Sequence, residues 1–282
     1  MRSPETVDLT RWRAFGWLDE PDAALAAKQH DALCTLLSEA GAEVLFAHAD
    51  APADPDAVYA CDPAIMSDRG ALILRPGKEG RRMEAAAMAE DLRALGVPVV
   101  LEMTDPATAE GGDAMWLDES TLLVGRSYRT NDAGIGALRD ALPGVDVLAF
   151  DLPDLKGPDA CLHLLSLLSP LDDDLAVAHV PQMPIRLLQL LRERDVEIVQ
   201  VPEEEFDSMG PNVLALAPRA ALAVDGNPET RRRMERAGVE VFVYEGSEIS
   251  HKGEGGPTCL TRPVLRAPSD RRTRSGAPGR ER

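Results

Sequence analysis

RRMERAGVEVFVY, residues 232–244, decides the fold, because the chain repeats this passage from helix to strand five times. A charged helical stretch ends at Gly238, and a hydrophobic strand follows at once. The other copies are LLSEAGAEVLFA (36–47), DLRALGVPVVLE (91–102), LRDALPGVDVLAF (138–150) and LLRERDVEIVQV (190–201). The junction residues are Gly41, Gly96, Gly144, Asp195 and Gly238. Glycine reaches the left-handed conformation at a helix C-terminus without steric cost, so these junctions predict helix ends.

Shorter strands precede the later helices, in GALILRPG (70–77), TLLVGRS (121–127), DLAVAHV (174–180) and AALAVDG (220–226). A unit of about 50 residues that carries strands and one helix has to bury its apolar face against neighbouring units. Five such units predict an α/β protein, a five-bladed pseudo-symmetric α/β propeller. A doubly wound parallel sheet also alternates strands and helices and is the competing fold. The extra strands beside each helix favour the ring.

Composition excludes several classes of protein. The formal charge of −18 argues against nucleic-acid and anionic-membrane binding, because both need a basic surface. The start lacks the apolar run of a signal peptide, and no window approaches the roughly 18 apolar residues that cross a bilayer, so we expect a cytoplasmic protein. A hydrophobic content of 44% suits one large core. We predict a single catalytic domain over residues 1–267 and a disordered basic tail at 268–282.

The cysteines are widely separated and form no CxxC pair, which argues against a disulfide framework and against a zinc ribbon. They are Cys34, Cys61, Cys161 and Cys259. We therefore expect reduced thiols.

One polar or reactive residue follows each helix-to-strand junction at a similar place in the repeat. These residues are Asp62, Glu110, His163, Asn212 and Cys259, at spacings of 48, 53, 49 and 47 residues. A five-fold ring would bring all of them to one end of a central channel. Taken singly, an acid beside glycines is usually a turn residue, a histidine in an apolar run is usually a core residue, and a lone cysteine is usually a buried thiol. Their shared phase favours a functional site.

The residue types at these five positions indicate a particular chemistry. A thiol becomes a nucleophile only when an imidazolium, a cationic substrate or backbone amides help it to ionise, and the turn GEGGPTC (253–259) could offer such amides. One histidine can then act as acid for the leaving group and as base for water. Carboxylates beside a thiol raise its pKa, so they fit only if a cation binds between them. A guanidinium group meets that requirement.

Several motifs resemble the guanidino-group-modifying superfamily, the penteins, and most closely the dimethylarginine dimethylaminohydrolases. The similarity covers residues from about 7 to 266. It rests on AAKQHDAL (26–33), YACDPAIMSDRGALILRPGKEGRRME (59–84), EGGDAMWLDESTLLVGRSYRTNDAGI (110–135), CLHLLS (161–166) and GGPTCLTRPVLR (255–266). EGGD, GRSxRTN and GGxxCLT in this order are specific together. The resemblance implies a pentein fold and a reaction at a guanidinium carbon.

Carried over residue by residue, the resemblance implies that Cys259 is the nucleophile and that His163 is first the general acid and then the base. Glu110 and Asp62 are implied to hold the guanidinium group. The implied reaction passes through a covalent thiouronium intermediate and gives a ureido product. It needs no cofactor and no metal, and a zinc site built on Cys161 and His163 would have too few ligands.

The resemblance also assigns the far end of the substrate. Arg81 and Arg129 are implied to bind a carboxylate, although either arginine could instead be a solvated or structural side chain. Asp56 aligns with an acid near the amino end of the substrate. Leu18 lies in FGWLDEPD (15–22), where dimethylarginine hydrolases carry a mobile lid.

Two positions depart from the pattern of the superfamily. Leu165 stands where arginine deiminases have an aspartate for the unsubstituted guanidino nitrogens, which favours an alkylated guanidine with fewer N–H donors. Cys61 stands where dimethylarginine hydrolases usually have a glutamate, so a contact near the amino end is lost.

We therefore expect a hydrolase of N-alkylated guanidino compounds, most simply dimethylarginine to citrulline and dimethylamine, that acts on a small cationic substrate and forms a possible homodimer. The alternatives are an amidinotransferase or an arginine deiminase-like hydrolase. A non-catalytic binding module, as in the ribosome anti-association factors of this fold, is less favoured because the thiol, the imidazole and the acid are all present.

Overall fold

A computed structural model describes residues 1–48, 54–155, 157–158, 160 and 162–266 of the 282-residue chain. The predicted tail at 268–282 and Cys161 lie outside the described residues. The prediction of one domain over residues 1–267 stays a prediction.

Four three-stranded sheets make up the regular part of the fold, and each follows the same order. An antiparallel pair of strands comes first, and a helix then leads to a third strand that lies parallel to the second. The strands are β1 (Ala64–Ser67), β2 (Gly70–Ile73) and β3 (Val99–Glu102); β4 (Ala114–Asp118), β5 (Thr121–Arg126) and β6 (Asp146–Asp151); β7 (Leu168–Asp172), β8 (Leu175–Ala178) and β9 (Glu197–Gln200); β10 (Val213–Ala217), β11 (Ala220–Val224) and β12 (Glu240–Tyr244). The crossover helices are α2 (Glu84–Ala94), α3 (Asp132–Ala141), α4 (Ile185–Glu193) and α5 (Pro228–Arg236). The predicted strand–helix alternation is confirmed in these four units, and the extra strands are the antiparallel partners that exclude a single doubly wound sheet.

Helix α1 (Ala23–Glu39) belongs to a unit that differs from the other four. The described residues 42–48 after α1 contain no strand, contrary to the expectation from LLSEAGAEVLFA. The reason is local. Met1 donates to the carbonyl of Leu45 and accepts from the amide of Ala47, whereas the amide of His48 donates to the side chain of Asp91. Backbone pairing with one residue is not enough to form a β-ladder.

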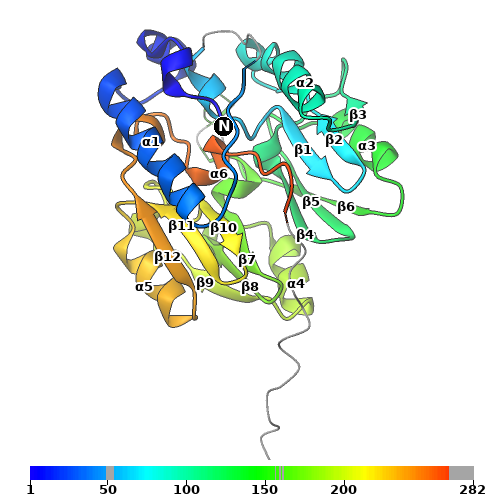
Figure 1. Ribbon diagram of the computed structural model, residues 1–282. Helices are drawn as coiled ribbons and strands as arrows, with labels where there is room; N and C mark the ends of the chain where they lie inside the picture. The colour runs from blue at the N-terminus through cyan, green and yellow to red at the C-terminus, as the bar shows by residue number, and fades with distance from the viewer. Residues whose placement is uncertain (49–53, 156, 159, 161, 267–282) are drawn as a thin grey trace, which may run out of the picture.

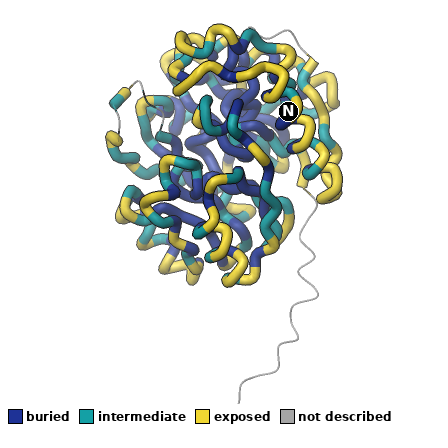
Figure 2. The backbone as a smooth tube through the Cα atoms, turned by 90° about the vertical axis from the view of Figure 1, so that its left-hand side faces the viewer, coloured by how far each residue is buried: buried dark blue, intermediate teal, exposed yellow. Residues whose placement is uncertain are grey.

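The sheets surround the short helix α6 (Pro257–Leu260), while α1 to α5 lie on the periphery (Figure 1). The middle strand of each sheet is almost entirely buried, because it has strand neighbours on both sides and a helix over one face. The buried backbone accordingly gathers in the interior and the exposed positions at the outside (Figure 2). Residues that precede or follow the strands at the inner ends therefore meet near α6.

The predicted helix ends are confirmed by the backbone. Gly41, Gly96, Gly144 and Gly238 have φ angles of 90°, 75°, 89° and 82°, and Asp195 has 55°. All five lie in the left-handed region that follows a helix C-terminus. Asn227 and Pro228 are the N-cap and first residue of α5.

Short 3-10 helices connect the elements, at Pro4–Thr6, Leu9–Phe15, Pro55–Val58, Glu79–Arg81, Gly111–Asp113, Leu164–Ser166, Val180–Gln182 and Glu203–Glu205, and a π-helical turn spans Ser247–His251. Within the described ranges, we find no helix that is both long enough and apolar enough to span a bilayer.

Candidate active site

The polar residues that share a phase in the repeat meet at the inner ends of the sheets. One ligand-type atom from each of Asp62, Glu110 and His163 lies within 4.8 Å of the other two. His163 Nε2 is 2.7 Å from Glu110 Oε2. Asn212 Nδ2 donates to Cys259 Sγ over 3.4 Å, so the fourth and fifth positions also touch. By spacing alone the first three groups could hold a metal ion, and they could equally hold a planar cation.

Glu110 is held as an anion. The backbone amide of Lys78 donates to its Oε1 over 3.1 Å, while His163 bonds to Oε2. Burial raises the pKa of Glu110, but the hydrogen bond and charge of His163 and the charges of Arg81 and Arg129 outweigh it, and the net pKa is lowered. The carboxylate therefore stays charged in a buried setting, which suits the binding of a cation.

Gly111 and Gly112 allow the close approach on which this cluster depends. A Cβ at Gly112 would lie 2.3 Å from Nδ1 of His163, and a Cβ at Gly111 would lie 2.1 Å from the carbonyl oxygen of Cys61. Their amides are used too, since Gly112 N donates to Asp62 Oδ1 over 3.0 Å. The two glycines of EGGD therefore bring the acid, the imidazole and Asp62 together.

Asp113, the last residue of EGGD, ties three segments of the site together. Its Oδ2 accepts from the hydroxyls of Ser127 (2.6 Å) and Thr130 (2.8 Å), and its Oδ1 accepts from the amide of Leu164 (3.1 Å). Asp113 is fully buried, and burial raises its pKa to about 6. It thus anchors the turn that carries Arg129 and the turn that begins at His163.

Cys259 lies in α6, behind a glycine run that packs against two side chains. A Cβ at Gly255 would lie 2.1 Å from the ring of Tyr59, and a Cβ at Gly256 would lie 2.4 Å from Asn212 Oδ1. Asn212 Oδ1 also accepts from the hydroxyl of Thr258 over 2.8 Å. The glycines are therefore needed for close packing around the thiol. This explains them more directly than the amide cradle considered from the sequence.

The thiol of Cys259 is protonated in the resting site. Burial raises its pKa and the charge of Asp62 raises it further, while His163 and the hydrogen bond from Asn212 lower it. A bound cation beside Asp62 would offset the second cause and favour the thiolate.

Arg81 lies in a closed ion cluster beneath the site. Its Nη1 donates to Asp62 Oδ2 (2.5 Å), and its Nε and Nη2 donate to Glu84 (2.8 Å each). Nη2 also donates to the backbone carbonyls of Asp56 and Tyr59. The side chain is 4% exposed. Its predicted contact with a substrate carboxylate competes with these bonds.

Asp56 is buried and both of its carboxylate oxygens are engaged. Trp17 Nε1 donates to Oδ1 over 2.8 Å, and Lys78 Nζ donates to Oδ2 over 2.5 Å. Lys78 Nζ also donates to the carbonyl of Phe15. Next to this group, Leu18 is exposed, and its amide donates to the carbonyl of Lys252, seven residues before Cys259. An ammonium group of the protein thus occupies the place expected for the amino end of a substrate.

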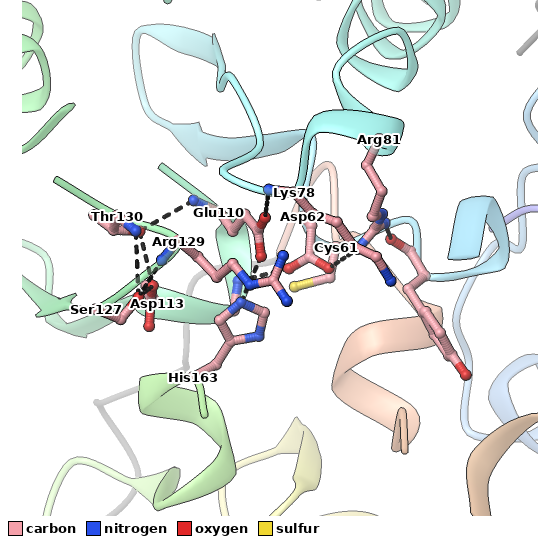
Figure 3. A network of polar contacts seen from close by, with 12 residues as sticks. Cys61, Asp62, Lys78, Arg81, Glu110, Asp113, Ser127, Arg129, Thr130 and His163 are labelled. Atoms are coloured by element: carbon pink, nitrogen blue, oxygen red, sulfur yellow. Dashed lines mark hydrogen bonds and ion pairs between the residues drawn. The ribbon is translucent and has the colours of Figure 1, made fainter. Parts of the chain in front are cut away.

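Arg129 has a different setting from Arg81. Its side chain points toward Glu110 and His163 (Figure 3), and its Nε has no hydrogen-bond partner among the residues that the structure covers. It lines a cavity of about 320 Å³ together with His163, Asn212, Cys259 and others. Arg129 and the nucleophile therefore face the same space.

The sequence analysis missed two contributors, Asp113 and Lys78. Asp113 belongs to the EGGD motif, so its place in that motif was the available signal. Lys78 gives no signal, because a surface-type lysine in a turn predicts nothing about Asp56. Cys61 is buried, and Arg262 Nη2 donates to its carbonyl oxygen over 2.7 Å. Leu165 is half-buried among apolar side chains.

Comparison with known proteins agrees with this arrangement. Residues 18–266 match the family model described as N,N dimethylarginine dimethylhydrolase, eukaryotic. The chain is 32% identical over 245 residues to the N(G),N(G)-dimethylarginine dimethylaminohydrolase of Streptomyces coelicolor, which covers 86% of this chain and 87% of that protein. It is 28% identical to the Pseudomonas aeruginosa enzyme of the same name over 86% of this chain and 90% of that one.

Solved structures show the same relationship. The Pseudomonas aeruginosa enzyme in complex with citrulline superposes with a TM-score of 0.73 at 28% identity, covering 86% of this chain and 89% of that chain. The N-terminal domain of ArgZ, a cyanobacterial arginine dihydrolase, gives a TM-score of 0.80 at 18% identity and covers 94% and 98% of the two chains, which shows the shared fold alone. The resemblance to the pentein superfamily is confirmed, and the chain belongs to the N,N-dimethylarginine dimethylhydrolase family, a family of hydrolases.

Proposed function

We propose that this protein is a cysteine-dependent hydrolase of N-alkylated guanidino compounds, and that dimethylarginine, giving citrulline and dimethylamine, is the simplest substrate. The observation that supports the proposal is that Cys259 and His163 line one cavity, while Glu110 and Asp62 lie beside His163. A buried thiol beside two carboxylates is a poor nucleophile unless a cation enters. A guanidinium group supplies both the charge and the electrophilic carbon.

In the first half of the reaction the substrate binds with its guanidinium group between Glu110 and Asp62. Its positive charge offsets the effect of Asp62 on Cys259, and the thiol passes its proton to His163. The thiolate then forms a bond to the guanidinium carbon. The C–N bond to the alkylated nitrogen breaks as His163 donates a proton to that nitrogen, so an amine leaves and a thiouronium group stays on Cys259.

In the second half a water molecule attacks the same carbon, and His163 accepts its proton. The C–S bond breaks, the second proton of the water passes to the sulfur, and the thiol and a ureido product result. Glu110 acts throughout by holding His163 through the 2.7 Å contact and by balancing the positive charge. Arg129 contributes by binding a substrate carboxylate at the cavity mouth, and we keep the same role for Arg81 and a lid contact for Leu18 as parts of the proposal.

The five-unit wheel belongs to the same proposal. Helix α1 and the segment around α6 would together form the fifth unit, although neither carries a regular strand in the described residues. The spacing of 47 to 53 residues between the five polar positions supports this reading.

Two features bear on the substrate class. Leu165 offers no acceptor for unsubstituted guanidino nitrogens, which favours alkylated ones. The Asp56–Lys78 ion pair favours a second candidate class, alkylated guanidines without an α-ammonium group, because Asp56 already has two protein donors.

The test is a panel of guanidines incubated with the purified protein, with and without an acceptor amine. The panel holds arginine, dimethylarginine, and the dimethylguanidino acid that lacks the α-amino group. We expect ureido products from the two alkylated compounds, and a protein adduct on Cys259 in mass spectra of quenched reactions. A new guanidine formed only with the acceptor amine would show amidino transfer instead. Turnover of the panel without an adduct, or turnover by Cys259→Ser, would exclude the thiol mechanism.

A further inference from the structure

A second cluster of reactive side chains, separate from the residues of the candidate active site, lies on α1. His30 and Cys34 are four residues apart, so they project from the same face of the helix. Met1 packs against them. Cys34 Sγ is 3.7 Å from His30 Nδ1 and 3.8 Å from Met1 Sδ. A thiol, an imidazole and a thioether therefore meet at one point.

The position of Met1 is set by its backbone rather than by its side chain. Its amino group donates to the carbonyl of Leu45 over 2.8 Å, and its carbonyl accepts from Ala47 over 2.7 Å. These two bonds hold Met1 beside the helix. The thioether consequently stays next to Cys34, whose thiol donates to it over 3.8 Å.

The cluster holds more hydrogen-bond acceptors than donors. Met1 Sδ is an acceptor only, a neutral imidazole has one acceptor nitrogen, and Cys34 has one S–H donor. Its single proton can bond to the imidazole nitrogen or to the thioether sulfur, but not to both. A cation in place of that proton would bond to all three atoms.

We propose that Met1, His30 and Cys34 form a binding site for a soft monovalent metal ion, Cu(I). Thiolate and thioether sulfur select Cu(I) among the biological metals, and imidazole also suits copper. Bonds of about 2.3 Å to sulfur and about 2.0 Å to nitrogen place the donors of a planar three-coordinate ion about 3.7 to 4.0 Å apart. The measured separations of 3.7 and 3.8 Å fall in that range.

Binding replaces a proton with the metal. The Cys34 S–H bond breaks, its proton passes to solvent, and the sulfur forms a bond to Cu(I). No electron is transferred. The thiolate and the ion then form a neutral unit, and the carboxylate of Asp31 on the same helix adds a negative charge nearby that favours a cation.

Access and shielding also fit a metal site. A surface hollow borders Cys34, and Ser38, Val44 and Phe46 form part of its wall. His30 is 1% exposed, and the ring of Phe46 lies 6.1 Å from the His30 ring. An ion can therefore reach Cys34 from the surface, while the imidazole side stays shielded from water.

The test is an anaerobic titration with the acetonitrile complex of Cu(I), in competition with bicinchoninate and followed by absorbance. All proteins carry Cys161→Ser and Cys259→Ser, so that neither of these thiols can bind the metal. We expect one tightly bound Cu(I) per chain in this background. Cys34→Ser should remove it, and His30→Gln should weaken it at least tenfold, whereas Cys61→Ser and the matched exposed variant His48→Gln should keep it.

A second measurement is independent of these variants and of their folding. X-ray absorption should show two sulfur neighbours and one nitrogen neighbour around copper, and selenomethionine labelling should replace one of the sulfurs by selenium. Absence of the selenium neighbour, retention of Cu(I) by the folded Cys34→Ser variant, or no tight binding to the parent protein would each overturn the proposal.

Discussion

Arg81 and Arg129 lie on two sides of the same site and differ in burial and in hydrogen bonding. Both are arginines that the resemblance assigns to a substrate carboxylate. Arg81 is buried and bonds to Asp62, Glu84 and two carbonyls. Arg129 lines the cavity, and its Nε finds no partner in the described part of the chain. The guanidinium group of Arg81 thus stabilises the folded site, whereas that of Arg129 is available to bind a ligand.

This contrast divides the site into a structural side, around Arg81, and a reactive side, around Arg129, His163 and Cys259. Substitutions on the structural side should act mainly on the free energy of unfolding. Substitutions on the reactive side should act mainly on kinetics.

Cys259→Ser tests the reactive side and should have the largest effect. We expect kcat to fall by about a thousandfold or more, because serine is a far weaker nucleophile in a site built to favour a thiolate. The thermal midpoint should stay within a few degrees, since the two side chains differ little in volume. Steady-state assays and a thermal melt give both numbers, and unfolding of this variant would mean that the thiol is structural.

Arg81→Met tests the structural side. It leaves the buried carboxylates of Asp62 and Glu84 without their cation, which should lower the free energy of unfolding by about 3 to 5 kcal/mol in urea titrations. The matched variant Arg129→Met should lower it by less than about 1 kcal/mol and raise KM for carboxylate-bearing substrates by about tenfold. If the two variants behave alike, the division of the site is wrong.

Asp113→Asn tests the structural side of the site through the pH dependence of stability. Burial raises the pKa of Asp113 from 3.8 to about 6, so the folded protein holds this proton more tightly than the unfolded chain. The contribution of Asp113 to stability is therefore full below pH 4 and is lost as the pH rises to about 6, a change of about 3 kcal/mol. Asparagine does not titrate.

The stability of the parent relative to Asp113→Asn should thus fall between pH 4 and pH 6 and be constant above about pH 7. Urea unfolding of both proteins at several pH values measures the difference in their free energies of unfolding. The contributions of the other titrating groups cancel in this difference. A flat difference would mean that Asp113 ionises normally in the folded state.

Lys78→Ala should have the smallest effect, and it tests the end of the site away from the thiol. Its amide still donates to Glu110, so we expect kcat for the deaminated substrate to change less than about threefold. Removal of the ammonium group releases Asp56, which should raise kcat/KM for dimethylarginine relative to that substrate by about tenfold. An unchanged ratio would show that Asp56 does not meet the substrate.

Much of the architecture follows from local rules that act within one repeat. The glycine junctions have the left-handed backbone that they predict, and the strands before the later helices form as expected. The strand after α1 is absent because its pairing depends on a distant partner, and only Met1 is offered. The meeting of Asp62, Glu110 and His163 was predictable for the same reason as the sheets, since residues at one phase of a repeat meet at one end of the fold.

The remaining contacts were beyond prediction because they join side chains across the repeats. The engagement of Asp56 by Lys78 depends on the path of a 3-10 turn, and the burial of Arg81 depends on Glu84 being three residues away on the same turn. On α1, Leu25 is 36% exposed, while His30 is buried. Hydrophobic periodicity places a helix face only to within about one residue in the turn, so a polar residue can take the inner place.

The two roles of Lys78 have a consequence for how such enzymes diversify. Its amide donates to Glu110, and every residue except proline has that amide. Its side-chain ammonium group forms the ion pair with Asp56. A single substitution at position 78 can therefore change which group the substrate needs at its amino end, while the residues around the thiol stay the same. Relatives with identical catalytic residues can then differ in their substrates.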